Sequence, residues 1–288
     1  MALPRIEAFE FNDSPWVPAP LRDLIVESLS RHLDWGGALA GVAGPFAQFL
    51  HAAGTPEVLD LCSGAGGPAR ILVQELARAG ARPPRFLLTD LNPQITAWED
   101  LRMRFPDSID YIHAPVDATC IPPVISRGRA RVLINAFHHF PPAIARWVLA
   151  DAVRSSEGIF LAEVLERSVT SFATFAALGP AALLLTPLLT RRHRLAKALL
   201  AWGTPAAWAT AVWDGVVSSL RTYNEQELRS LVSPLGSSFH WHHGTFAYWP
   251  GGRGSYFYGV RRHRGRRRAG PHSLHRPDHE QLASAKTS

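Results

Sequence analysis

The sequence has few cysteines, few charged residues and no apolar segment at its start. Its two cysteines, Cys62 and Cys120, are too few for a disulfide framework, so we expect a reducing compartment, which we interpret as the cytoplasm. Residues 1–13 have no apolar core, so we expect no signal peptide. Charged residues make up 19% of the chain and hydrophobic residues 47%, the composition of a globular protein with a large core.

The positive charge of the chain is concentrated in its last residues. The formal net charge is +6, and residues 261–288 alone contain seven arginines and one lysine against two acids. The rest of the chain is therefore neutral. No aromatic residues alternate with these arginines and no nucleic-acid-reading motif accompanies them. We predict a disordered basic tail over residues 263–288 and no nucleic-acid partner.

A glycine loop follows a short apolar segment near residue 60. Val58–Cys62 is an apolar run with Asp60 at its centre, three glycines follow, and Pro68 opens a helical pattern. This order of strand, glycine loop and helix is typical of sites for nucleotide-type cofactors. The loop fits a dinucleotide pattern, but Asp60 would repel a pyrophosphate. The same carboxylate suits the ammonium group of S-adenosylmethionine (SAM).

The segment Val58–Gly66 resembles the first motif of the class I SAM-dependent methyltransferases, with Cys62 where that family usually has its first glycine. The resemblance implies an α/β fold, with a Rossmann-like, seven-stranded, mostly parallel sheet over residues 56–262. It implies SAM as the cofactor. It also implies the following cofactor-binding residues: Asp60, Cys62, Ser63, Gly64, Gly66, Asp90, Leu91, Asp117, Ala118 and Asn135.

Acidic residues follow the next two predicted strands. The run Arg85–Asp90 predicts a strand that ends in an acid, which suits the two hydroxyl groups of a ribose. The resemblance gives Asp90 that role, and helix capping is the alternative. Ile109–Ala114 predicts a third, shorter strand. Asp117 after it resembles the family's acid that accepts a hydrogen bond from the adenine amino group, although a loop aspartate also serves turn geometry.

Two histidines follow the fourth predicted strand, which spans residues 131–135. The family meets its substrate at this place. His138 and His139 are candidate catalytic bases, because imidazole exchanges protons near neutral pH. Packing or cofactor contact is the alternative for both. Glu163 ends the fifth predicted strand and is a further candidate base, because ligands in such sheets bind at the carboxyl ends of the strands.

Three more histidines lie close together near residue 240. His240, His242 and His243 have no cysteine or acid at ligand spacing beside them. We therefore predict no metal site.

Two helical regions are expected beside the sheet. Residues 1–55 predict an N-terminal helical extension that either packs on the sheet or covers the cofactor. Residues 168–220 predict an apolar helical insert, in which Ser171–Thr190 carries no charge but contains Pro180 and Pro187. We favour a lid that shapes an apolar acceptor pocket. A peripheral membrane hairpin is the alternative.

Two smaller features carry specific expectations. Pro142–Val153 predicts a helix with Ile144, Trp147, Val148 and Val153 facing inward. Glu166 and Arg167 are expected to form a pair on the surface.

These features together predict SAM-dependent methyl transfer, by direct in-line displacement, to a small and hydrophobic acceptor. The alternatives are a membrane-associated lipid methyltransferase, an NAD-dependent Rossmann oxidoreductase and a SAM-binding module without catalysis. The predicted partner is a small molecule, with peripheral membrane contact as the open alternative.

Overall fold

The computed structural model describes residues 4–12, 14, 16–167, 169–190, 192–249 and 251–262, with side chains left undescribed over 169–178. The predicted basic tail over 263–288 lies outside the described residues.

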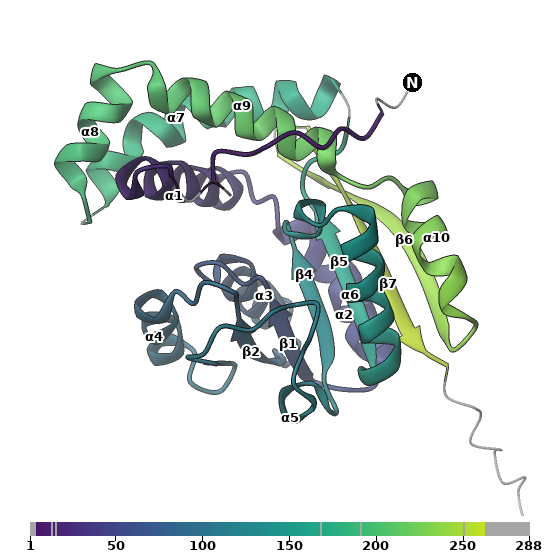
Figure 1. The fold of residues 1–288 in the computed structure, drawn as a ribbon. Helices are drawn as coiled ribbons and strands as arrows, with labels where there is room; N and C mark the ends of the chain where they lie inside the picture. The colour runs from purple at the N-terminus through teal and green to yellow at the C-terminus, as the bar shows by residue number, and fades with distance from the viewer. Residues whose placement is uncertain are drawn as a thin grey trace, which may run out of the picture.

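A seven-stranded sheet in the order β3-β2-β1-β4-β5-β7-β6 forms the centre of the molecule (Figure 1). The strands are β1 (Glu57–Leu61), β2 (Arg85–Thr89), β3 (Ile109–Tyr111), β4 (Ala130–Ile134), β5 (Gly158–Glu163), β6 (Phe239–Tyr248) and β7 (Gly252–Arg261). Strands β1 to β5 pair in parallel, whereas β7 pairs antiparallel with both β5 and β6. This topology confirms the predicted Rossmann-like, seven-stranded, mostly parallel sheet, and its antiparallel part lies at one end.

Helices cover both faces of the sheet and bury its apolar residues. Neighbouring residues of β1 belong to different cores: Val58 packs with α2, α3 and α4, whereas Leu59 packs with α6 and α10. These helices and the short segments between them are η1 (Ala40–Val42), α2 (Ala43–Ala53), α3 (Gly67–Arg78), α4 (Ile95–Arg104), α5 (Pro123–Ser126), η2 (Phe137–His139), α6 (Pro142–Ser155), α10 (Glu225–Val232) and η3 (Ser233–Leu235). Burial on both faces explains why the parallel strands are continuous apolar runs.

Four helices form a separate layer beyond the sheet, which we call the helical cap (Figure 1). They are α1 (Ala19–Trp35), α7 (Val169–Leu189), α8 (Arg194–Gly203) and α9 (Ala206–Arg221). Leu24 of α1 and Leu183 of α7 share one buried cluster. The fully buried Lys197 lies with its Nζ 2.7 Å from Glu27 Oε1, and thereby joins α8 to α1.

The cap lies over the carboxyl end of β4, because α9 contacts η2, which follows that strand. The N-terminal 55 residues therefore divide between two places. Helix α1 packs with the insert helices, and α2 packs on the sheet.

Among the helices of the described ranges, none combines the length and the apolar character that crossing a bilayer requires.

Two of the smaller expectations are wrong. Ile144 and Trp147 of α6 are exposed, Trp147 by 68%, because Ala145 and Val148 supply the buried face of the helix. Arg167 is buried and its Nη2 lies 2.5 Å from Oε2 of Glu227.

The packing of α1 against the insert leads to a stability prediction. Leu24→Ala should lower the free energy of unfolding by about 2–5 kcal/mol, because it opens a cavity between α1 and the insert. Leu195→Ala is the matched control, since Leu195 is 86% exposed and its change should stay within about 0.5 kcal/mol. Urea unfolding of the full chain, followed by circular dichroism, measures both. Equal effects of the two substitutions would contradict this packing.

Candidate functional site

The glycine loop between β1 and α3 is fixed by hydrogen bonds to both neighbouring strands. Ser63 N–H donates to Thr89 O (3.0 Å), and Ser63 Oγ donates to Asp60 O (2.9 Å). The φ angles of Cys62, Gly64 and Gly66 are 57°, 52° and 78°, so the chain turns through three left-handed residues before α3 begins. The predicted strand, glycine loop and helix are therefore present in that order.

Asp60 is a buried carboxylate at this loop, with only 3% of its surface exposed. Its Oδ2 has no hydrogen-bond partner within the described part of the chain. Burial raises the pKa of Asp60 to about 7. A buried polar atom without a partner is costly, so this oxygen is suited to receive a donor from a ligand.

Asp90 closes the loop from β2. Its Oδ2 accepts a hydrogen bond from Gly64 N–H (2.9 Å) and its Oδ1 one from Asn92 N–H (2.8 Å). Leu91, the next residue, is exposed. Two backbone donors leave room on a carboxylate that offers about four acceptor positions. Asp90 therefore combines a turn-forming role with free acceptor capacity.

The environment of Cys62 shows that three acids gather around the loop. Burial raises the pKa of the Cys62 thiol to about 12, and the charges of Asp90, Asp60 and Asp117 act in the same direction. The thiol is therefore protonated and unreactive at neutral pH. The loop is an electronegative environment, which favours a cationic ligand over a phosphate.

Asp117 and Ala118 follow β3 in a turn. Asp117 Oδ1 accepts hydrogen bonds from the backbone N–H (2.8 Å) and the hydroxyl (2.7 Å) of Thr119, and the residue is exposed. Ala118 is buried in the core that contains Leu59. These contacts are those of a turn-forming aspartate.

Asn135 turns the chain at the end of β4. It adopts a left-handed φ of 56°, and its N–H donates to Ala162 O (2.7 Å). This turn leads directly into η2, which carries both histidines.

Glu163 holds His138 through two contacts. Its Oε1 accepts a hydrogen bond from the His138 backbone N–H (3.0 Å), and its Oε2 lies 2.8 Å from His138 Nδ1. Both residues are buried. The carboxylate is therefore placed to hold the proton on Nδ1, which leaves Nε2 as the nitrogen with a lone pair. The sequence predicted both residues separately, and the structure pairs them.

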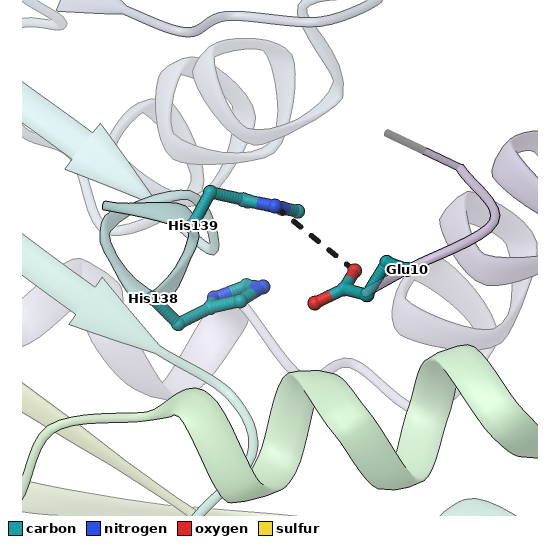
Figure 2. Close-up of side chains that lie close together, drawn as sticks. All are labelled: Glu10, His138 and His139. Carbon is teal, nitrogen blue, oxygen red and sulfur yellow. Dashed lines mark ion pairs between the residues drawn. The ribbon is translucent and has the colours of Figure 1, made fainter. Parts of the chain in front are cut away.

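Glu10 is a site residue that the sequence analysis missed. It is 3% exposed, and its Oε1 accepts a hydrogen bond from Arg221 Nη1 (2.8 Å). Its Oε2 lies 4.0 Å from His139 Nδ1, as Figure 2 shows. No local pattern could have indicated this position, since Glu10 precedes both histidines by more than a hundred residues.

The N-terminal segment is bound to the cap and to η2, which places Glu10. The backbone N–H groups of Phe11 and Asn12 donate to the carboxylate of Asp214 on α9 (2.8 and 3.1 Å). Arg5 donates to the carbonyl oxygens of Phe140 (3.2 Å) and Arg221 (2.7 Å). The segment therefore closes over the end of β4.

Comparison with known proteins identifies the fold. No protein-family model and no curated protein matches the sequence. A provisionally named O-methyltransferase from Nostoc punctiforme is 15% identical, with a TM-score of 0.50 over 90% of this chain and 64% of that one.

Two further solved structures are similar at lower scores. Human N-acetylserotonin methyltransferase is 13% identical, with a TM-score of 0.49 over 84% of this chain and 55% of that one. Magnesium protoporphyrin IX methyltransferase from Synechocystis is 12% identical, with a TM-score of 0.44 over 86% and 90% of the two chains. At these identities, the similarity to the Nostoc structure shows a shared fold, that of the class I SAM-dependent methyltransferases, as the sequence motif predicted.

The loop geometry leads to a prediction about its glycines. Gly66→Ala should destabilise the protein by about 1–2 kcal/mol, the cost of a left-handed residue with a side chain, and its Cβ would also lie 2.5 Å from a methyl group of Leu101. Gly67→Ala is the matched control, because no atom lies within 4 Å of its new Cβ. Thermal unfolding of the ligand-free protein compares the two, and an equal loss in both variants would argue against this loop conformation.

Proposed function

We propose that this protein is a SAM-dependent methyltransferase that acts on a small apolar acceptor. The observation that carries the proposal is the buried Asp60, whose Oδ2 lacks a partner among the described residues at the end of β1. An ammonium group would satisfy this oxygen and lower the pKa of the carboxyl group again. A pyrophosphate would meet three carboxylates instead, so the charges oppose the alternative of a dinucleotide cofactor.

The proposed cofactor contacts follow the order of the strands. Asp60 would receive the ammonium of SAM, and Asp90 the ribose hydroxyls with its remaining acceptor positions. Asp117 and Ala118 would face the adenine. The backbone of the loop, with Leu91 and Asn135 beside it, would enclose the rest of the cofactor; the loop residues concerned are Cys62, Ser63, Gly64 and Gly66.

The chemistry proposed is a direct displacement at the methyl carbon. SAM, when bound, would supply the methyl group: its carbon–sulfur bond would break with the electron pair left on sulfur as the acceptor's lone pair forms the new bond, and a proton on the acceptor would pass to His138 or His139. Holding the nucleophile in line at about 3 Å from the methyl carbon can lower the activation barrier by on the order of several kcal/mol. The reason is that the reactants have already lost their translational and rotational freedom on binding. His138, His139 and Glu163 are the proposed catalytic residues on the acceptor side, with Glu163 positioning His138.

Aromatic residues pack beside the histidine turn, which supports an apolar acceptor: Phe137 and Tyr223 belong to the buried core there, and Phe140 is partly exposed at its edge. The ring centroids of Phe137 and Tyr223 lie 5.4 Å apart, and those of Phe137 and Phe140 lie 6.1 Å apart. The helical cap covers the same end of the sheet. A small aromatic or isoprenoid molecule with one nucleophilic atom fits these surroundings.

The test of the proposal is calorimetry with SAM at several pH values. SAM should bind one site per chain, and its affinity should rise about tenfold between pH 5.5 and 7, because the free carboxyl of Asp60 has a pKa of about 7 and only its ionised form pairs with the ammonium. The donor's amino group, with a pKa of about 7.7–8.0, stays protonated over this interval.

Asp60→Asn should weaken SAM binding by about 10–100-fold, the range expected for a lost charged hydrogen bond, and should remove the pH dependence. Asp110→Asn is the control, since Asp110 is an exposed acid on β3. Saturation by a nicotinamide dinucleotide without any heat from SAM would refute the assignment.

A second candidate function, contact with a lipid surface, is favoured by one face of the cap. Leu195, Leu199 and Trp202 of α8 lie on successive turns and are all exposed. The exposed Arg192 and Arg194 lie at the start of this helix, and residues 192–213 contain no acid. Apolar residues beside arginines suit an anionic bilayer surface.

Vesicle sedimentation tests this second candidate. The full chain should pellet with phosphatidylglycerol vesicles, and the double variant Leu195→Ser and Leu199→Ser should lose most of that binding because the apolar face is removed. Met103→Ser with Val124→Ser is the control, since both residues are exposed apolar positions on other helices. Sedimentation that is unchanged in the α8 variant, or absent from the native chain, would exclude the contact.

A further inference from the structure

We infer that Glu10, His138 and His139 form a binding site for one first-row divalent transition-metal ion. Each of the three residues offers a ligand atom, and these atoms all lie within 4.8 Å of one another. Figure 2 shows the three side chains pointing toward one another, from the N-terminal segment and from η2. Two imidazoles and a carboxylate are a ligand set that Zn²⁺, Co²⁺ and Fe²⁺ all accept.

The spacing of the ligand atoms is close to what a single ion requires. Nitrogen and oxygen ligands lie about 2.1 Å from such ions, so two of them around a four-coordinate ion are about 3.4 Å apart. The ligand atoms here lie within 4.8 Å of one another, so side-chain rotations would bring them together around one ion. The imidazole rings of His138 and His139 already lie side by side, with centroids 4.2 Å apart and 34° between their planes.

A second set of residues orients these ligands. Glu163 lies 2.8 Å from His138 Nδ1, which leaves Nε2 for an ion, and a carboxylate on the far nitrogen is the usual partner of a metal-bound histidine. Arg221 holds Oε1 of Glu10 at 2.8 Å and leaves Oε2 on the side of His139. His138 and Glu10 are therefore each held in place through one side-chain atom, and the other side-chain atom is left for the ion.

The charges around the cluster balance an ion. The positive charge of Arg221, which contacts Glu10, would repel a metal ion. The negative charges of Glu10, within the cluster, and of Glu163, behind His138, would attract it. Glu10 and His138 are buried, whereas His139 is partly exposed, so an ion would enter from the side of His139. Three protein ligands leave coordination positions open, as in catalytic rather than structural sites.

The position of the cluster suggests what the open positions hold, and this step rests on the proposed function. The cluster lies at the carboxyl end of β4, under the cap that covers the acceptor side. An acceptor hydroxyl bound to the ion would lose its proton to solvent more readily and then receive the methyl group. The acceptor class is therefore an alcohol or phenol, which gives an O-methylated product. In this arrangement His138 and His139 act as ligands and Glu163 positions His138.

Metal titration of the full chain, after removal of metals by chelation, tests the inference without any methyl transfer. Calorimetry with ZnCl₂ should show one ion per chain, and CoCl₂ should give the visible absorption of a low-coordinate Co²⁺ site. Glu10→Gln and His139→Ala should each weaken binding at least tenfold. Glu163→Gln should weaken it by about 10–100-fold, as expected for a residue that orients a ligand.

Two control variants separate this cluster from others. Glu7→Gln changes an exposed acid on the same N-terminal segment. His242→Ala changes a histidine of a different pair, His240 and His242, whose rings lie next to each other on β6. Both should bind the ion like the native chain. Circular dichroism of every variant confirms that it is folded.

The inference is overturned if the native chain binds neither ion, or if binding survives Glu10→Gln and is lost in His242→Ala. SAM calorimetry on the same metal-free protein is independent of this result. Intact SAM binding without metal binding would refute the metal site and leave the proposed function standing. Metal binding without SAM binding would refute the proposed function, and with it the role given to the ion in methyl transfer, but not the metal site.

Discussion

The contact between Glu163 and His138 is the constraint on which the acceptor side of the site depends. One carboxylate accepts the backbone N–H of His138 and lies 2.8 Å from its ring Nδ1, so it fixes both the turn after β4 and the orientation of the imidazole. Such an arrangement requires β4 and β5 to be neighbours in register, which they are, with Ile134 opposite Ala162. Without this carboxylate, the buried His138 N–H would have no acceptor, which is costly in a buried turn.

Charge separates the site into two parts. Three carboxylates act on Cys62 at the glycine loop, whereas the histidine turn is bordered by Arg5 and Arg221 as well as by acids. A ligand with a positive end is therefore favoured at the loop. The histidine turn has side chains of both charge signs beside it, and the rings of Phe137 and Tyr223 pack into the core behind it.

The sequence predicted the sheet and the cofactor loop well because their signals are local. Buried parallel strands are apolar runs, and the loop between Asp60 and Pro68 needs glycine where φ is positive. The acceptor side could not be predicted in the same way, since Glu10 and Arg221 meet only in the folded chain. The inward face of α6 was also predicted only in part, because Ala145, Val148, Leu149 and Ala152 form its buried stripe and Trp147 does not. The sequence therefore failed where the structure depends on contacts between distant residues or on which residues of a helix face the core.

The N-terminal segment connects the cap to the histidine turn after β4. Asp214 on α9 accepts a hydrogen bond from the segment's backbone at Phe11. Arg5 of the same segment donates to the carbonyl oxygen of Phe140, the residue after the two histidines. The same segment carries Glu10 into the cluster, so a displacement of the cap would move a site residue as well as the cover of the site. The position of the cap and the assembly of the polar residues at the end of β4 are therefore coupled. This coupling gives a physical reason why helix α1 packs with the insert, more than a hundred residues away, rather than on the sheet.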